Sequence, residues 1–148
     1  MSVDASFQFV DTNILIYAHD NSAGEKHRLA VELLDSLWNN HTGCLSVQVL
    51  QEFYVTITRK VKHPLPSAIA SQIINDLSAW EIHSPTALDV ITAIALHQRY
   101  NIAFWDAMIL QSAQCLGCQV VWSEDLNPEQ TYNGVSIANP FLEISHPG

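Results

Sequence analysis

The sequence predicts an α/β domain whose mainly parallel sheet is covered by helices on both faces. Short apolar runs alternate with amphipathic helical segments along the 148 residues. The runs lack the two-residue polar and apolar alternation of a half-exposed antiparallel strand, so both of their faces should be buried. With 48% hydrophobic residues, a chain of this length can bury about two thirds of its unfolded surface in one core. We therefore expect one domain over residues 1–148.

The first half of the chain predicts two strands and three helices. Residues 7–10 form an apolar run that ends at Asp11, and a short helix over residues 14–18 follows. A helix over residues 24–39 has apolar residues at the spacing of one face, namely Ala30, Leu33, Leu34, Leu37 and Trp38. Residues 43–47 are the second strand, which leads into a helix over residues 50–61.

Pro64 and Pro66 end that helix, because proline lacks the backbone donor and disfavours helical geometry in the residue before it. A helix over residues 67–80 and a short strand at 81–83 follow. The next helix begins near Pro85, and its expected core face is Leu88, Ile91, Ala95 and Tyr100.

After a short apolar run at residues 102–104 comes the last predicted helix, which Gly117 caps. Its expected core face is Trp105, Met108, Ile109, Ser112 and Leu116. Residues 119–122 are strand-like, and residues 135–138 are expected to form a last edge strand.

The charge and the hydropathy pattern restrict the class of protein. The net charge is −9, with 15 acids and six bases, and such a field repels nucleic acid at long range. Clustered acids that bind divalent cations would offset this repulsion. No apolar stretch approaches the roughly 18 residues that cross a bilayer, so we expect no membrane span. The N-terminal residues carry Asp4 where a secretory signal carries Lys or Arg, so we expect a cytoplasmic protein.

The cysteines and histidines do not indicate a metal or disulfide framework. Cys44, Cys115 and Cys118 are an odd number, and lone Cys44 cannot complete a zinc site with the other two. We interpret all three as small apolar residues. No histidine lies in a His-Glu-x-x-His frame or pairs with a cysteine at metal-binding spacing, so a zinc hydrolase is disfavoured.

Four acids are predicted to meet at one edge of the sheet. Asp11, Asp106 and Asp125 follow apolar runs directly or nearly so, and Glu52 lies two turns into the helix after the second strand. Ligands bind at the carboxyl ends of parallel strands. Each acid alone has a structural explanation, such as a helix cap, a turn or a solvated face. Together they would repel one another without cations, and carboxylates are the ligands that Mg²⁺ and Mn²⁺ prefer. The four acids therefore predict a divalent-metal site suited to phosphodiester cleavage.

The segments that carry these acids resemble the four motifs of PIN domains. They are residues 10–15 (VDTNIL), 48–53 (QVLQEF), 104–109 (FWDAMI) and 122–126 (WSEDL). The likeness covers nearly the whole chain, including the sequence NPF at residues 139–141, and in order and spacing it is nearest to VapC-type toxins of toxin-antitoxin pairs. The resemblance implies a three-layer α/β/α sandwich with a central, mainly parallel sheet. It also implies a Mg²⁺- or Mn²⁺-dependent endoribonuclease and an antitoxin that blocks its site.

The resemblance assigns roles to individual residues. Asp11 and Asp106 would hold the principal ion, and Glu52 and Asp125 would hold a second ion or its waters around an in-line attack by activated water. Two supporting residues, Asn13 and Ser123, would hold a carboxylate or a metal-bound water. Glu124 is expected to point the other way, because neighbouring side chains of an extended chain face opposite sides.

The sequence also leads to expectations about the substrate contact and the partners. Arg59, Lys60 and Lys62, with His63, form the densest basic patch, which is either a phosphate contact or a solvated helix end. An RNA substrate, a basic or amphipathic antitoxin segment laid into a groove, and a second copy of the chain are the expected partners.

Two other classes of protein with acids at strand ends are disfavoured, and two PIN-like alternatives stay open. Haloacid-dehalogenase-like phosphatases need a second acid where Asn13 stands, and receiver domains need a lysine late in the chain, where none follows Lys62. A DNA-cutting or RNA-processing PIN-like nuclease and a non-catalytic PIN-like domain that binds nucleic acid or a protein partner stay open.

Overall fold

The computed structural model describes residues 6–142, so the N-terminal residues that bear on secretion lie outside the described part. Its sheet has the strand order β3-β2-β1-β4-β6-β5. Five strands are parallel, and they are β1 (Gln8–Val10), β2 (Gly43–Ser46), β3 (Glu81–His83), β4 (Val120–Trp122) and β6 (Val135–Ala138). The edge strand β5 (Thr131–Tyr132) is antiparallel to β6. The predicted mainly parallel sheet is confirmed.

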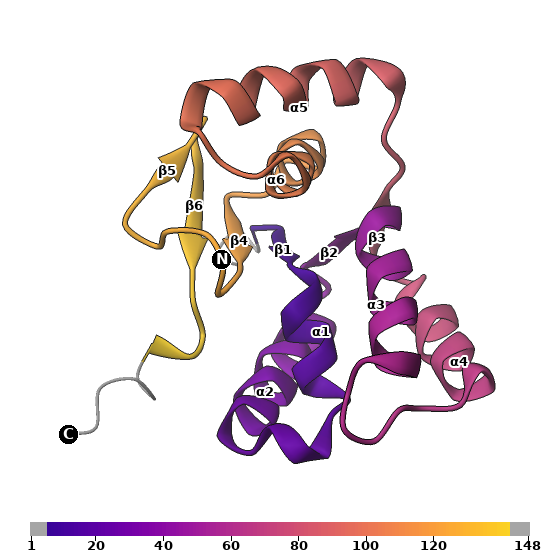
Figure 1. Cartoon of the computed structure of the whole chain (residues 1–148). Coiled ribbons are helices and arrows are strands. Elements are labelled where there is room, and N and C mark those ends of the chain that lie inside the picture. The colour runs from indigo at the N-terminus through magenta and orange to yellow at the C-terminus, as the bar shows by residue number, and fades with distance from the viewer. Residues whose placement is uncertain (1–5, 143–148) are drawn as a thin grey trace.

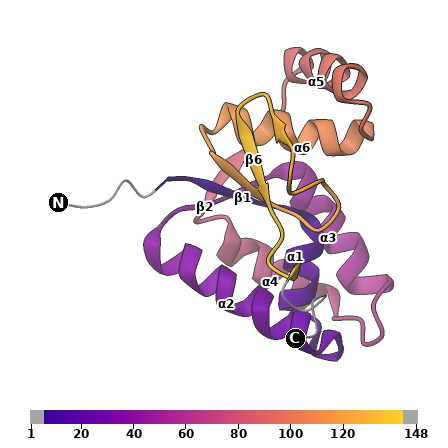
Figure 2. The same cartoon turned by 90° about the vertical axis from the view of Figure 1, so that its left-hand side faces the viewer.

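Helices flank the sheet, as expected (Figures 1 and 2). One side carries α1 (Thr12–Ala18), α2 (Glu25–Asn40), α3 (Val47–Arg59) and α4 (Ser67–Leu77), with a short 3-10 helix (Asn21–Ala23) before α2. The other side carries α6 (Phe104–Cys115), and α5 (Ala87–Tyr100) lies outside it. Within residues 6–142, no helix is long and apolar enough to cross a membrane.

The central strand β1 brings Asp11 to the carboxyl edge of the sheet. Phe9 and Val10 are fully buried, because β1 has neighbouring strands on both sides and helices on both faces. Asp11 comes next, and its backbone N–H donates to the carbonyl of Trp122 at the end of β4, 3.0 Å away. Asp125 follows β4, so these two acids lie at adjacent strand ends.

Two of the predicted strands need correction. Residues 102–104 form no strand, because α6 already begins at Phe104, so Asp106 lies in the first turn of a helix and does not follow a strand. The strand at residues 135–138 is present, but it pairs with both β4 and β5 and is not the edge. The edge strand β5 has only two residues, which is too short for a periodicity to reveal it.

The expected core faces of the last two helices are also partly wrong. In α5, Leu88 and Ile91 are 70% and 62% exposed, Ala95 is exposed too, and Asp89, Ala93 and Leu96 are buried instead. The cause is Asp89, which forms a capping box with Thr86 and bonds to α6, so the helix turns its polar N-terminal residue inward. In α6, Trp105 is 61% exposed.

Candidate functional site

All four predicted acids line one pocket of about 490 Å³. Asp11 comes from the end of β1, Asp125 from the turn after β4, Glu52 from the second turn of α3, and Asp106 from the first turn of α6. Asp11 is only 7% exposed, whereas Asp125 lies open to solvent. The pocket thus has a buried acid at its base and more accessible acids around it.

Neutral side chains hold Asp11 and Asp125 in place. The Ser123 hydroxyl donates to Asp11 over 2.9 Å, and the Asn13 amide donates to Asp125 over 2.8 Å. Asn13 and Ser123 are the two residues for which the sequence predicts a supporting role. The Ser123 oxygen also accepts the backbone N–H of Asp125 at 3.1 Å, which ties the turn after β4 to the base of the pocket. The carboxylates are therefore oriented before any ligand binds.

The acids raise one another's proton affinity. Burial raises the pKa of Asp11 from an ordinary 3.8 to about 6, and the nearby charges of Asp125 and Asp106 add to the effect against the hydrogen bonds from Ser123 and Thr12. Burial also raises the pKa of Asp106, with further contributions from the charges of Asp125 and Glu52. Burial and, to a smaller extent, mutual repulsion disfavour the charged carboxylates, and a bound cation would offset both effects.

Sequence reasoning missed several residues of the pocket, among them Thr12, Gln48 and Trp105. The Thr12 hydroxyl donates to Glu52 over 2.7 Å. The Gln48 amide nitrogen lies 3.5 Å from Glu52 and 3.4 Å from the carbonyl of Trp105. Trp105 itself lines the wall. Gln48 and Glu52 are four residues apart on one helix, and this spacing indicates that their side chains are neighbours. Thr12 meets Glu52 only through the tertiary fold, so no sequence spacing indicates that contact.

The fold places only one residue of the predicted basic patch in the acid pocket. Lys60 lines the acid pocket, but Arg59, Lys62 and His63 are exposed residues outside it. Glu124 also lies outside the pocket, where its carboxylate accepts from the Tyr17 hydroxyl and pairs with Lys26 at 2.8 Å. Glu124 thus points away from the pocket as expected, although residues 124 and 125 form a bend and not the extended segment assumed for that prediction.

The donor set of the pocket fits a hard divalent cation. The candidate ligands are oxygens: four carboxylates and the Gln48 amide oxygen, which is buried without a partner in the described part of the chain. Oxygen ligands of this kind suit Mg²⁺ and Mn²⁺ better than zinc or copper. Buried acceptors are normally hydrogen-bonded, and a water molecule bound to the cation would donate to the Gln48 oxygen if that oxygen is not itself a ligand.

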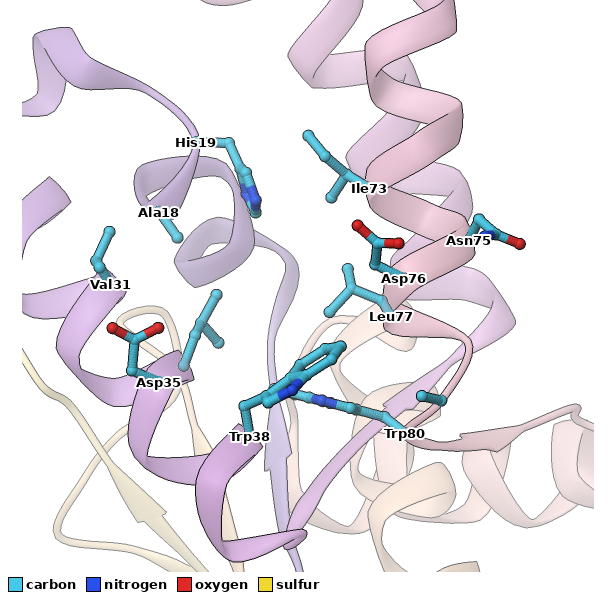
Figure 3. A pocket seen from close by; sticks show the side chains of 12 residues that line it. Ala18, His19, Val31, Asp35, Trp38, Ile73, Asn75, Asp76, Leu77 and Trp80 are labelled. Atoms are coloured by element: carbon cyan, nitrogen blue, oxygen red, sulfur yellow. The ribbon is translucent and has the colours of Figure 1, made fainter.

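A second, larger hollow of about 600 Å³ lies between α1, α2 and α4 (Figure 3). Its lining is mostly apolar and includes Val31, Trp38, Ile73 and Trp80. Two exposed acids of its lining, Asp35 on α2 and Asp76 on α4, come from opposite walls. The hollow shares no lining residue with the acid pocket.

Comparison with known proteins identifies the family. The family model of the PIN domain matches residues 9–133, so this chain belongs to the PIN domain family. No protein with a curated description matches the sequence.

Solved structures of toxin-antitoxin proteins share the fold. A toxin-antitoxin complex from Klebsiella pneumoniae has a TM-score of 0.65 at 20% identity, covering 90% of this chain and 97% of that one. The sarcin-ricin loop cleaving toxin VapC20 of Mycobacterium tuberculosis has a TM-score of 0.65 at 21% identity, covering 87% and 98%. DNA-bound VapBC from Salmonella typhimurium has a TM-score of 0.64 at 18% identity, covering 91% and 98%.

Proposed function

We propose that this PIN domain protein is a divalent-metal-dependent endoribonuclease and the toxin of a toxin-antitoxin pair. The observation that carries the proposal is the convergence of Asp11, Glu52, Asp106 and Asp125 on one pocket. The family and the toxins that share its fold support the choice of nuclease and of RNA. Mg²⁺ or Mn²⁺ is the expected cofactor.

The residues of the pocket divide the work of phosphodiester hydrolysis. A bound divalent cation supplies an activated water and neutralises charge on the phosphate. Asp11 and Asp106 would hold that cation, and Glu52 and Asp125 would hold a second cation or its waters. The hydrogen bond from Ser123 orients Asp11, and the hydrogen bond from Asn13 orients Asp125. No side chain of the pocket is needed as a nucleophile.

Matched RNA and DNA strands test the proposal. The protein is expected to cut within the RNA strand in the presence of Mg²⁺ or Mn²⁺ and to leave it intact in a chelator. Cleavage of DNA in preference to RNA would support a DNA nuclease of the same family. No cleavage of either strand with either metal would leave a non-catalytic binding domain, and the enzyme assignment would be wrong.

Trp105 and Lys60 are the pocket residues suited to grip the substrate. Lys60 is the single Lys or Arg among the lining residues, and a protein of net charge −9 gains little from long-range attraction. Base stacking does not depend on charge, and the exposed Trp105 ring is supported by the edge of Phe104 at 5.1 Å between ring centroids. We infer that Trp105 stacks on an unpaired base beside the scissile phosphate.

Substitutions at these two positions are expected to weaken substrate binding. Trp105→Ala should raise the KM for RNA about tenfold, because a stacked base contributes ~1–3 kcal/mol, and Trp105→Phe should retain most of the binding. Lys60→Gln should raise KM and weaken its salt dependence. Arg59→Gln is the matched control, since Arg59 neighbours Lys60 but does not line the pocket. Equal effects at Arg59 and Lys60 would contradict this assignment.

The hollow between α1, α2 and α4 is the proposed docking site for the antitoxin. Its apolar lining suits the apolar face of an amphipathic segment, and Asp35 and Asp76 suit Lys or Arg on the edges of that segment. The antitoxin complexes among the structures of the same fold favour a protein occupant. The charge of the hollow thus selects a basic partner.

Charge reversal in the hollow tests the docking site. Asp35→Lys together with Asp76→Lys is expected to weaken binding of the small companion protein that copurifies from the native host by at least tenfold. Glu32→Lys, an exposed acid of α2 outside the hollow, is the control. Unchanged inhibition of the nuclease by that companion in the Asp35/Asp76 variant would exclude this site.

A second copy of the chain is proposed to cover the exposed face of α5. Leu88, Ile91 and Ile94 are exposed there without an exposed charged residue between Ala87 and Gln98. A neutral apolar face is the kind that two copies of an acidic protein can bring together without repulsion. Light scattering of the purified protein checks this homodimer.

A further inference from the structure

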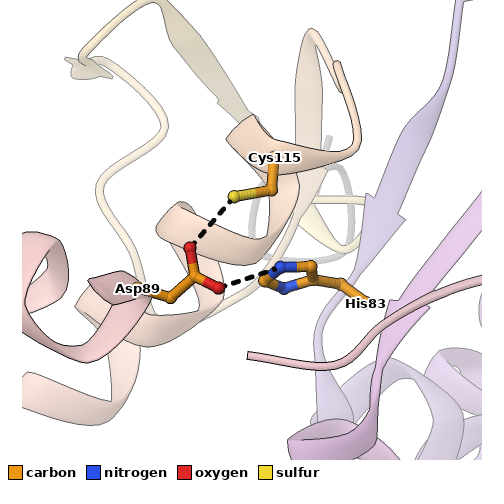
Figure 4. Close-up of side chains that lie close together, drawn as sticks. All are labelled: His83, Asp89 and Cys115. Carbon is orange, nitrogen blue, oxygen red and sulfur yellow. Dashed lines mark hydrogen bonds and ion pairs between the residues drawn. The ribbon is translucent and has the colours of Figure 1, made fainter. Parts of the chain in front are cut away.

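A second group of metal-binding side chains lies away from the acid pocket (Figure 4). His83 ends β3, Asp89 lies in the first turn of α5, and Cys115 ends α6. One donor atom from each lies within 4.8 Å of the other two. None of the three lines the acid pocket, and the proposed nuclease reaction uses none of them.

The separations between donors match those in a tetrahedral zinc site. His83 Nε2 is 3.3 Å from Asp89 Oδ2, and Cys115 Sγ is 3.3 Å from Asp89 Oδ1. Ligand bonds of about 2.0–2.3 Å to zinc place neighbouring tetrahedral ligands roughly 3.3–3.6 Å apart. Two donor pairs therefore already stand at the separation that a shared tetrahedral ion requires, His83 through Oδ2 of Asp89 and Cys115 through Oδ1.

The surrounding residues orient these donors as they would around a metal. Ser112 Oγ lies 2.8 Å from His83 Nδ1, which leaves Nε2 facing Asp89. The backbone N–H of Thr86 donates to Asp89 Oδ2 over 2.8 Å. Metal-binding histidines are commonly held through their other ring nitrogen, and binding carboxylates are commonly hydrogen-bonded in turn.

Gln111 lies beside the cluster and has one buried polar atom without a partner among the described residues. It is 8% exposed, and its Oε1 has no hydrogen-bond partner among the described residues. Its Nε2 donates to Asp89 Oδ1 over 3.0 Å and lies 3.3 Å from Cys115 Sγ. The two ends of an amide have nearly the same shape, so a half-turn of the amide would place Oε1 at these distances. In that orientation Oε1 would be available as a further ligand, in place of the N–H group that now donates to Asp89.

We propose that His83, Asp89 and Cys115, with Gln111 as the fourth ligand, bind a zinc-type cation. Sulfur and nitrogen donors select zinc over magnesium. The exposed Cys115 provides the entry path, and its thiol proton leaves to solvent when the ion binds. The ion would join β3, α5 and α6, and so fasten the outer helix α5, in which only Asp89, Ala93 and Leu96 are buried, to the helix that carries Asp106.

Cobalt substitution tests this site in the full chain. Adding Co²⁺ to the reduced, metal-free protein is expected to produce a near-ultraviolet sulfur-to-cobalt charge-transfer band, which zinc then removes. Cys115→Ser and His83→Gln should lose or strongly reduce the band. Cys118→Ala should keep it, because Cys118 is a buried thiol outside the cluster. Zinc at about 100-fold over its dissociation constant should also raise the Tm by roughly 5 °C or more in the parent and not in His83→Gln.

The outcomes separate this site from the nuclease site. Asp106→Asn should keep the cobalt band, because oxygen ligands alone produce no sulfur charge transfer. A parent protein that takes up cobalt without the band, or a band of full strength in Cys115→Ser, would overturn the proposal. The cluster would then be a hydrogen-bonded network that only fastens α5 to α6.

Discussion

Replacing Asp106 with Asn is expected to abolish metal-dependent RNA cleavage while the fold stays intact. The substitution conserves shape, and it removes a carboxylate whose charge is already destabilised by burial and by Asp125 and Glu52. The loss of a direct ligand should exceed the roughly 10–100-fold cost of losing an outer-shell partner. The rate of RNA cleavage in Mg²⁺ or Mn²⁺ measures the effect, and circular dichroism checks the fold.

Asp76→Asn is the matched control for this experiment, because Asp76 is an exposed acid of α4 outside the acid pocket. The control should cleave RNA at the parent rate. If Asp106→Asn cleaved RNA as fast as the control, the metal site as assigned would be wrong.

Replacing Asp11 with Asn is expected to stabilise the metal-free protein above pH 6 and to abolish its response to metal. The raised pKa of Asp11, about 6 against 3.8, means that the folded protein holds a proton that the unfolded chain has released. The metal-free parent therefore loses stability as the pH rises from about 4 to about 6. That difference in pKa corresponds to about 3 kcal/mol in the free energy of unfolding at neutral pH.

Denaturant unfolding in a chelator at pH 5 and pH 7.5 measures this effect. The Asp11→Asn variant should lose less stability than the parent between these pH values, because Asn does not ionise. Adding Mn²⁺ at pH 7.5 should stabilise the parent and leave the variant unchanged. If the free energy of unfolding changed equally with pH in the two proteins, Asp11 would not be the group with the raised pKa.

The position of the acids was largely predictable because the fold brings the segments that carry them to the same edge of the sheet. Asp11 and Asp125 follow apolar strands, and adjacent parallel strands end at the same edge of a sheet. Asp106 was placed at this edge for the wrong local reason, since it begins a helix and no strand precedes it. The helix N-terminus brings it to the same edge as the strand ends, so the error changed the element but not the site.

The orientation of α5 was not predictable from its periodicity. A helical repeat shows which residues share a face, but it does not show which face turns inward. In α5 the buried face is chosen by Asp89, whose partners Gln111 and Cys115 lie more than 20 residues further along the chain. The exposure of Trp105 and the partner of Thr12 depend on tertiary contacts of the same kind.

Direct titration with Mn²⁺ tests the central claim that the four carboxylates form one divalent-metal site. The titration is best made by calorimetry at pH 7.5 in the Cys115→Ser background, where the second cluster lacks its thiol ligand. This protein is expected to bind Mn²⁺, and the further substitution Asp11→Asn or Asp106→Asn should remove that binding. Equal Mn²⁺ binding by all three proteins, or none by the Cys115→Ser protein, would contradict the account.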